Sequence, residues 1–132
     1  MARKLLPVHK LREKAWGVIS EVRRREASDR CGYLICITCK EKVFWKEAHL
    51  SHFIHGHSKP TYLEPTNIHP SCARCNLHLS GNLAEYANFM NKTYGASEIE
   101  RLITLSHQVW KPSRELYDQL ITEYSARLKK LY

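Results

Sequence analysis

The stretch CITCKEKVFWKEAHLSHFIHGHSKPTYLEPTNIHPSCARCN, residues 36–76 of a 132-residue chain, decides the fold. Two Cys-x-x-Cys pairs bound it, Cys36/Cys39 and Cys72/Cys75. Each pair places two sulfurs on one side of a tight turn, and two pairs brought together supply the four thiolates of a tetrahedral zinc ion. We therefore predict that all four cysteines hold a structural Zn2+. Because four thiolates leave no open coordination position, we expect this ion to do no chemistry.

Disulfide bonds and redox catalysis are the two other uses of such cysteines. Disulfides are typical of secreted chains, and this sequence shows no secretory hydrophobic segment. A redox motif needs only one pair, next to a βαβ pattern that is not evident here. Zinc binding is therefore favoured. For the remaining Cys31 we expect a small buried side chain or a free thiol, with metal binding as a third option.

Most of the histidines gather between the two cysteine pairs. They are His49, His52, His55, His57 and His69, and His78 follows the second pair. The mixed apolar and aromatic segment 43–53 predicts a strand or a hairpin arm, and residues 58–60 predict a loop. Asn76 is expected in the first turn of a helix that runs to about Thr93, begun or interrupted by Gly81-Asn82. The resulting order is strand, loop, cysteine turn and helix.

In this order His52, Asn67 and Asn76 resemble the His-Asn-Asn variant of the HNH (ββα-metal) nuclease motif. The string SHFIHGHSKPTYLEPTNIHPSCARCNLHLSGNLAEY, residues 51–86, is similar to the phage NinG/Rap recombination nucleases. Those proteins carry Gly-His-Phe-Ile, then Asn-Ile/Val-His-x-x-Cys-x-x-Cys-Asn, then Ser-Gly-Asn and a Tyr. The likeness covers roughly residues 36–95. AHLSH at 48–52 also resembles phage endonuclease VII, which has a four-cysteine zinc followed by Asn.

The resemblance implies a metal-dependent enzyme that hydrolyses phosphodiester bonds. A neutral imidazole at His52 can take a proton from water, which makes the water nucleophilic. Asn67, by the same likeness, would hold or polarise that histidine. Asn76 would offer its amide oxygen to Mg2+ or Mn2+, because hard divalent ions prefer oxygen ligands. The N-terminus of the following helix would add a positive dipole end for the phosphate.

The chain departs from the family pattern at Ser51, where many HNH enzymes have Asp directly before the catalytic histidine. His49 is the first candidate to supply the missing metal ligand, and His55 and His78 are alternatives. An imidazole ligand would favour manganese, nickel or zinc over magnesium.

Structural roles are the alternative for these residues. His52 would then be a hydrogen-bonded structural histidine, and the two asparagines would be turn or cap residues.

The chain is basic, with a net charge of +8 and a pI of about 9.4. This balance predicts a polyanionic partner, either nucleic acid or an anionic membrane surface. No run of about twenty apolar residues is present, so we expect no membrane span. DNA contacts are predicted for Arg23, Arg24, Arg25, His55, His57 and Lys59. For the arginines, the alternative is a solvated helix end whose cations favour the helix dipole.

We expect one α+β domain over residues 1–132. It would hold a small zinc-stapled ββα-metal core at 31–95, a basic N-terminal helix within 1–30 and a C-terminal helical pair at 96–132. The first helix is expected from about 8 to 29, with an apolar face of Leu11, Ala15, Val18, Ile19 and Val22. The last helix should show the face Leu116, Leu120, Ile121, Tyr124, Leu128 and Leu131. The last two helices, within 96–132, are expected to pack on the core, with a homodimer surface as the second choice and a DNA clamp as a further option.

The sequence therefore predicts a divalent-metal-dependent DNA endonuclease. By resemblance, it would act on branched recombination intermediates such as Holliday junctions or D-loops, in the cytoplasm of a bacterial host, encoded by a phage or prophage. One alternative is a non-catalytic, zinc-containing DNA-binding or recombination adaptor. Another is an HNH nicking nuclease without sequence or structure preference.

Overall fold

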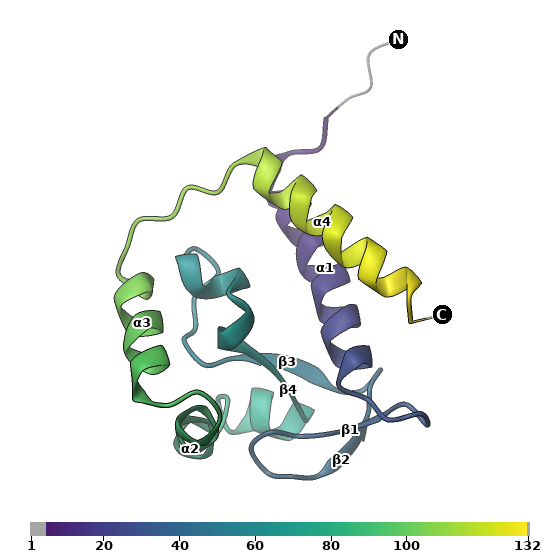
Figure 1. Ribbon diagram of the computed structural model, residues 1–132, viewed down its shortest axis with the longest axis vertical. Helices are drawn as coiled ribbons and strands as arrows, with labels where there is room; N and C mark the ends of the chain where they lie inside the picture. Colours follow the sequence, from purple (N-terminus) through teal and green to yellow (C-terminus); the bar gives the residue numbers. More distant parts are fainter. Residues whose placement is uncertain (1–4, 132) are drawn as a thin grey trace. The chain divides into compact units, whose positions relative to one another are not determined.

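The computed structural model describes residues 5–131, which form helices and small antiparallel sheets (Figure 1). The helices are α1 Val8–Glu26, α2 Leu83–Thr93, α3 Ala96–Ser106 and α4 Arg114–Lys129. The strands are β1 Tyr33–Ile35, β2 Lys42–Phe44, β3 His49–His52 and β4 Ile68–Ser71. Short helical turns are η1 Pro60–Leu63, η2 Pro65–Asn67 and the π-turn η3 Arg74–His78. The α+β class is confirmed.

The backbone contacts group the chain into two compact units, residues 1–22 with 111–132, and residues 23–110. The boundaries fall inside α1 and before α4, whereas the sequence suggested divisions after residues 30 and 95. A grouping by backbone contacts does not tell whether the two units fold independently. The single domain therefore stays a prediction.

The first unit holds most of α1 together with α4. Four of the five predicted apolar residues of α1 are buried: Leu11, Ala15, Ile19 and Val22. Helix α4 begins where the Ser113 hydroxyl accepts a hydrogen bond from the amide of Leu116. Its buried residues are Tyr117 and Tyr124, seven positions apart and so on one face. The sequence predicted Tyr124 but missed Tyr117, because the leucine pattern of this helix marks a neighbouring, half-buried stripe.

The second unit holds both sheets, each a pair of antiparallel strands, β1 with β2 and β3 with β4. The predicted single strand over 43–53 is wrong, because a turn separates β2 from β3. The amides of Glu47 and Ala48 both bond to the carbonyl of Phe44 and close that turn. The β1–β2 turn carries the first cysteine pair, and the second pair follows β4.

The helix after the second cysteine pair is interrupted, as Gly81-Asn82 indicated. Ser80, Gly81 and Asn82 all have positive φ angles, of 50°, 88° and 52°, between η3 and α2. A side chain at Gly81 would lie 3.3 Å from the Nε2 atom of His55, so both the backbone angle and the space favour glycine. Helix α2 then contributes buried Tyr86 and Met90 to a core that it shares with α3.

Among the described residues, no helix is both long enough and apolar enough to cross a bilayer.

Candidate functional site

The four predicted cysteines come together in one cluster, which we call the cysteine cluster. Their sulfur atoms all lie within 4.8 Å of one another, and the Sγ atoms of Cys39 and Cys72 are 3.6 Å apart. Two thiolates bound to one tetrahedral zinc at about 2.3 Å are roughly 3.8 Å apart, so the spacing fits this ion. All five cysteines are free of disulfides. Cys31 is exposed and outside the cluster, so the expectation of a buried side chain is wrong and that of a free thiol is confirmed.

Hydrogen bonds surround the sulfurs of the cysteine cluster. Burial opposes ionisation of Cys36, but bonds from the Thr38 hydroxyl, at 3.2 Å, and from backbone amides outweigh it and lower the pKa of its thiol to about 6. Burial and neighbouring thiols raise the pKa of Cys72 to about 12. The Cys72 thiol therefore ionises with difficulty, and a bound dication would favour its thiolate. The donor set and its spacing thus fit a structural zinc ion.

A second polar cluster lies on one face of the β3–β4 pair; we call it the Asn76 cluster. It consists of His49, Ser51, Ser71 and Asn76. In the strand register His49 lies opposite Ser71, and Ser51 lies opposite His69. The three strand residues of the cluster therefore share one face of the sheet with His69. Asn76, in η3, reaches this face.

The hydrogen bonds of the Asn76 cluster have a fixed direction. The hydroxyl of Ser51 donates to Oδ1 of Asn76 at 3.0 Å, and so the hydroxyl of Ser71 must donate to that of Ser51. The Nδ2 atom of Asn76 donates to Nδ1 of His49, also at 3.0 Å. His49 therefore carries a lone pair on Nδ1, which is the form that binds metals. The structure thus brings together the two predicted ligands of the catalytic ion, His49 and Asn76.

His52, the residue after Ser51, contacts a different segment. Its Nε2 atom lies 2.8 Å from the backbone carbonyl of Tyr62, and its ring stacks on that of Tyr62 with centroids 5.0 Å apart. Because the Tyr62 carbonyl can only accept a hydrogen bond, Nε2 must carry a proton. In the neutral ring Nδ1 is then unprotonated. Burial lowers the pKa of His52, against the opposing effect of the Tyr62 carbonyl, so the imidazole is neutral near pH 7.

Asn67 is completely buried and holds the loop that follows β3. Its Oδ1 accepts from the amide of Ile54, and its Nδ2 donates to the carbonyls of Ile54 and Thr61, at 2.8–3.0 Å. Its backbone carbonyl accepts from the amide of Phe53. The sequence predicted that Asn67 holds or polarises His52, and this stays a prediction. The Asn67 side chain ties the ends of the loop on which Tyr62 presents its carbonyl to His52.

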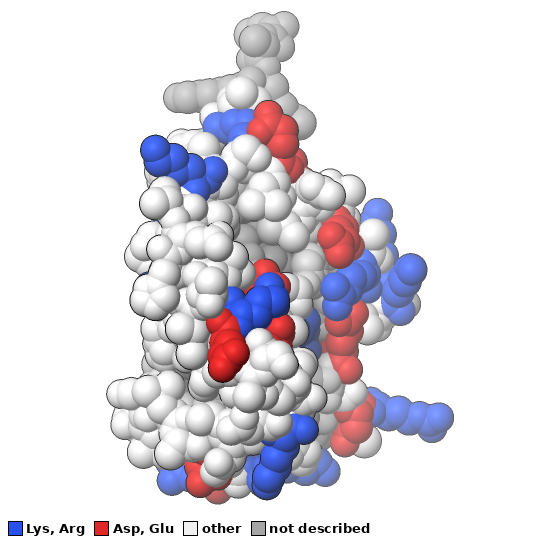
Figure 2. Space-filling view, turned by 60° about the vertical axis from the view of Figure 1, so that its left-hand side comes forward, with Lys and Arg blue, Asp and Glu red and all other residues white. Residues whose placement is uncertain are grey.

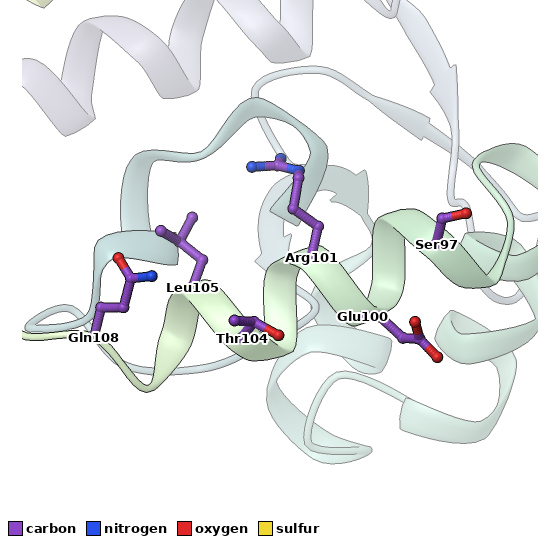
Figure 3. Close-up of a pocket in the computed structure, with 6 residues that line it drawn as sticks. All are labelled: Ser97, Glu100, Arg101, Thr104, Leu105 and Gln108. Atoms are coloured by element: carbon purple, nitrogen blue, oxygen red, sulfur yellow. The ribbon is translucent and has the colours of Figure 1, made fainter.

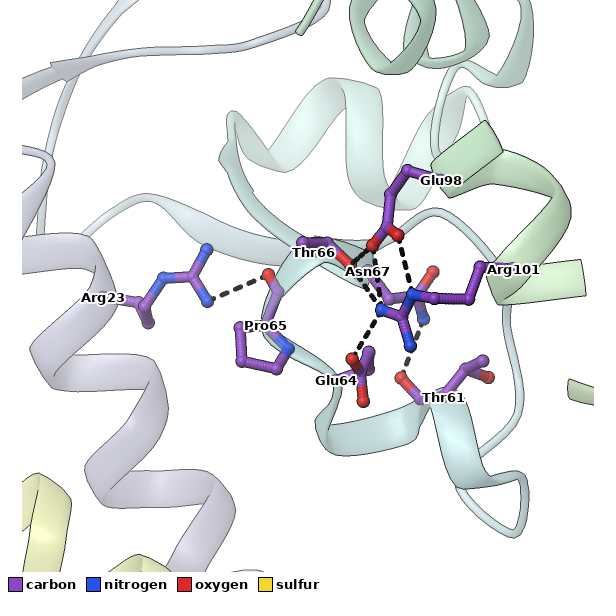
Figure 4. Close-up of polar contacts among 8 residues, drawn as sticks. All are labelled: Arg23, Thr61, Glu64, Pro65, Thr66, Asn67, Glu98 and Arg101. Carbon is purple, nitrogen blue, oxygen red and sulfur yellow. Dashed lines mark hydrogen bonds and ion pairs between the residues drawn. The ribbon is translucent and has the colours of Figure 1, made fainter. Parts of the chain in front are cut away.

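The outer side of this loop is held by an ion-pair network on α3, which we call the Arg101 network (Figure 4). Arg101 contacts Glu64 and Glu98, each at 2.6 Å, and Glu98 accepts a hydrogen bond from Thr66 at 2.6 Å. The bond from Arg101 is the largest cause that lowers the pKa of Glu98 to about 2. Helix α3 thereby fixes the turn between η1 and η2, next to Asn67.

The predicted DNA-contacting arginines already have partners inside this unit. Arg23 donates to the carbonyl of Pro65 at 3.2 Å (Figure 4) and to that of Ile68 at 2.6 Å. Arg24 donates to the carbonyl of Trp45 at 2.9 Å, and both Arg24 and Arg25 lie over its indole ring. On the face drawn in Figure 2, several of the described Lys and Arg side chains lie next to Asp and Glu side chains. DNA contact by these arginines stays a prediction.

Three further predicted DNA-contacting residues, His55, His57 and Lys59, are exposed on the loop between β3 and η1. The ring of His57 meets the edge of the Tyr62 ring at 6.4 Å. All three side chains are therefore exposed to solvent in the segment that directly precedes Tyr62, whose carbonyl contacts His52.

The sequence indicated that His69, beside the second cysteine pair, supports a site or packs in the core, and the structure buries it among aromatic side chains. It is 4% exposed, and its two ring nitrogens lie 2.8 Å from the hydroxyl of Tyr86 and 2.7 Å from that of Tyr94. Burial and the nearby charge of Arg23 lower the pKa of His69 to about 3, so the ring is neutral. The sequence contains a pattern that could have drawn attention to His69. His-x-Ser occurs at 49–51 and again at 69–71, and this spacing puts the His and the Ser of each pair on one face of a strand.

A shallow hollow of about 370 Å³ lies along α3 (Figure 3). Its lining side chains are Ser97, Glu100, Arg101, Thr104, Leu105 and Gln108. None of the predicted site residues lines it, and the guanidinium of Arg101 is bound to Glu64 and Glu98. We therefore locate the candidate site at the Asn76 cluster and His52.

The comparisons with known proteins bear on nearly the whole chain. The model of the family described as Bacteriophage Lambda NinG protein matches residues 6–132. No curated protein and no solved structure gives a significant match. Since the family model covers far more than half of the sequence, the chain belongs to the bacteriophage lambda NinG protein family.

Proposed function

We propose that this protein is a divalent-metal-dependent DNA endonuclease, with β3, β4 and the η3–α2 segment as a ββα-metal core. One observation carries the proposal. The amide of Asn76 lies 3.0 Å from Nδ1 of His49 and 3.0 Å from Oγ of Ser51. Two ligand atoms in adjacent positions of an octahedral ion, with bonds of about 2.1 Å, are roughly 3.0 Å apart. The spacing in the Asn76 cluster therefore suits such an ion.

His49 and Asn76 would hold this ion, through the Nδ1 lone pair and the amide oxygen. The ion would neutralise charge on the scissile phosphate and on the leaving oxygen. The amide of Asn76 must turn over to offer oxygen to an ion beside His49, and a cation between the two groups would favour that orientation. Ser51 and Ser71 would then fix Asn76 through their hydroxyls.

The metal preference follows from the donor atoms of this cluster. An imidazole nitrogen, an amide oxygen and hydroxyls are present, and Ser51 stands where many HNH enzymes have a carboxylate. Mn2+ accepts such a mixed set more readily than Mg2+, which prefers charged oxygen ligands and water. We therefore expect Mn2+ to support activity better than Mg2+.

His52 would act as the general base. Its Nε2 is held by the Tyr62 carbonyl and its imidazole is neutral near pH 7, so Nδ1 is the nitrogen that can accept a proton from water.

The substrate we propose is branched DNA, such as a Holliday junction or D-loop, in the cytoplasm of a phage-infected or lysogenic bacterium. Membership of a phage lambda family and the net charge of +8 support this. A homodimer would match the two-fold symmetry of a junction. The second candidate is a non-catalytic DNA-binding adaptor, which the missing carboxylate at Ser51 favours.

A cleavage assay tests the proposal. The zinc-loaded protein, His52→Ala and the control His107→Ala, an exposed histidine at the end of α3, are each given four-way-junction and linear duplex DNA. Each runs with Mg2+, Mn2+ or EDTA. We expect Mn2+-dependent cutting that His52→Ala reduces by about 100-fold or more, while His107→Ala cuts normally. Intact DNA in every metal, with binding retained, would support the adaptor.

A further inference from the structure

Three side chains connect α2 to the backbone of β3; we call them the His69 network. Tyr94, at the end of α2, lies against one nitrogen of His69, and Tyr86, inside α2, lies against the other. The hydroxyl of Tyr86 also donates to the backbone carbonyl of Ser51 at 2.9 Å. Tyr86 is fully buried, whereas Tyr94 is 37% exposed. The network therefore runs from the surface to the strand that carries the Asn76 cluster.

The protons of this network can be placed one by one. Tyr86 has one hydroxyl proton, and it goes to the carbonyl of Ser51, which has no proton to give. Tyr86 must then accept from Nδ1 of His69, so that nitrogen carries the proton. The neutral ring leaves Nε2 as an acceptor, and Tyr94 donates to it. Every bond thus points toward Ser51.

Close ring packing fixes the network in place. The ring of Phe89 meets that of His69 at 4.8 Å between centroids, with an angle of 72° between the planes. The rings of Tyr86 and Phe53 pack at 5.4 Å. A buried, fully hydrogen-bonded set of this kind has a single low-energy arrangement. The carbonyl of Ser51 is therefore held at a fixed place relative to α2.

Ser51 is also the residue whose hydroxyl donates to Asn76. Ser51 therefore links Tyr86 to Asn76. Its backbone carbonyl accepts from Tyr86, and its hydroxyl donates to Asn76. We propose that the Tyr86 hydroxyl is a positioning group for the divalent-metal site, which sets the affinity for the ion by fixing Ser51 and, through it, Asn76. This inference rests on the proposed function, because it assumes that the Asn76 cluster binds an ion.

Tyr94 supplies a matched control within the same network. Tyr86→Phe and Tyr94→Phe each remove one phenol oxygen bonded to His69, and each keeps the ring. Only Tyr86→Phe removes the bond to Ser51. A purely structural role for the network predicts a lower free energy of unfolding without a change in Mn2+ affinity that is specific to Tyr86→Phe, whereas the positioning role predicts weaker Mn2+ binding for Tyr86→Phe alone.

The experiment measures Mn2+ binding to zinc-loaded protein through the loss of the free-ion EPR signal, and it needs no DNA cleavage. We expect one Mn2+ site in the wild type, an affinity about tenfold weaker in Tyr86→Phe and an unchanged affinity in Tyr94→Phe. Equal affinity in wild type and Tyr86→Phe, or equal losses in both variants, would overturn the inference. Absence of any Mn2+ site in the wild type would instead overturn the proposed function on which it rests.

Ser51→Ala provides a second test should Tyr86→Phe fail to fold. It removes the hydroxyl that Tyr86 positions and leaves the buried phenol in place. We expect weaker Mn2+ binding in Ser51→Ala, because this substitution removes the hydroxyl that bonds to Asn76. Unchanged Mn2+ affinity in Ser51→Ala would refute the positioning role.

Discussion

The two ends of β4 are closed in different ways. After its last residue, Ser71, the chain turns into Cys72 and the cysteine cluster, whose four sulfurs are positioned to hold one metal ion. Before its first residue, Ile68, the chain is held by Asn67, which has three side-chain hydrogen bonds to its own loop. One end therefore offers a site for an ion, and the other is closed by bonds that the chain supplies.

This difference explains the place of the Asn76 cluster. Asn76 directly follows the last cysteine, and so its position depends on the cysteine cluster. His52 is oriented by Tyr62, and so its position depends on the loop that Asn67 holds. The two halves of the proposed site thus rest on separate supports, and damage to one support need not reach the other.

The largest effect is expected from breaking the metal-dependent end. Structural zinc contributes on the order of 10 kcal/mol to the folded state of small domains. Cys75→Ser replaces a fully buried ligand, so we expect loss of zinc and of cooperative thermal unfolding. Cys31→Ser is the matched control, because Cys31 is exposed and outside the cluster. Zinc content by mass spectrometry and melting by circular dichroism measure both. A zinc-loaded Cys75→Ser protein with wild-type melting would refute the zinc site.

The cysteine end was also the part that the sequence could predict. Two Cys-x-x-Cys pairs in one chain usually hold zinc, so all four residues of the cluster followed from their spacing. Asn76 followed from the family likeness, and His49 followed as the candidate to replace the carboxylate that is missing at Ser51. Strand limits were less accurate, because the turn between β2 and β3 is closed by backbone bonds to Phe44 that leave no mark in the residue pattern.

The other end could not be predicted in the same way. Tyr62 acts through its carbonyl, which every residue has, and so its contact with His52 has no sequence signature. The partners of Arg101, Glu64 and Thr66, are more than thirty positions away in the chain. Tyr86 was matched to the family motif, but its bond to Ser51 appears only when α2 is placed over β3.

The hydrogen-bonded end should fail by a smaller amount and without loss of zinc. Asn67→Ala removes three side-chain bonds and takes away the partner of the Ile54 amide and carbonyl, which costs about 3–4 kcal/mol of unfolding free energy. Asn91→Ala, at an exposed position on α2, should change it by less than about 0.5 kcal/mol. Urea unfolding with zinc assayed in parallel measures this. Zinc loss in folded Asn67→Ala would show that the two supports are coupled.

The His69 network, which stands between the two ends, predicts a dependence on pH. The pKa of His69 is about 3 in the folded chain, below its ordinary value of 6.5. Below pH 6.5 His69 becomes protonated in the unfolded chain and stays neutral in the folded chain. The free energy of unfolding therefore falls as pH falls. The difference between about pH 7 and about pH 5.5 is about 1 kcal/mol for this one residue.

Urea unfolding at both pH values, with zinc monitored, compares the wild type with His69→Gln. The variant should lose less stability on acidification than the wild type, because glutamine does not titrate. Parallel pH profiles for the two proteins would mean that His69 is protonated as easily in the fold as in the unfolded chain.

The smallest effect is expected from the Arg101 network, which supports the hydrogen-bonded end from outside. Its charges are partly exposed, so Arg101→Gln should cost only about 0.5–1 kcal/mol, and less in high salt. The pKa of Glu98 is lowered to about 2 from its ordinary 4.5. Its contribution is therefore complete above pH 4.5 and is lost as pH falls toward 2.

Urea unfolding of Arg101→Gln beside Lys92→Gln, an exposed control on α2, measures this contribution at low and high salt. A salt-independent loss of several kcal/mol would mean that Arg101 acts as a buried brace of the η1–η2 turn. The hydrogen-bonded end would then depend on charge nearly as strongly as the cysteine end depends on its ion.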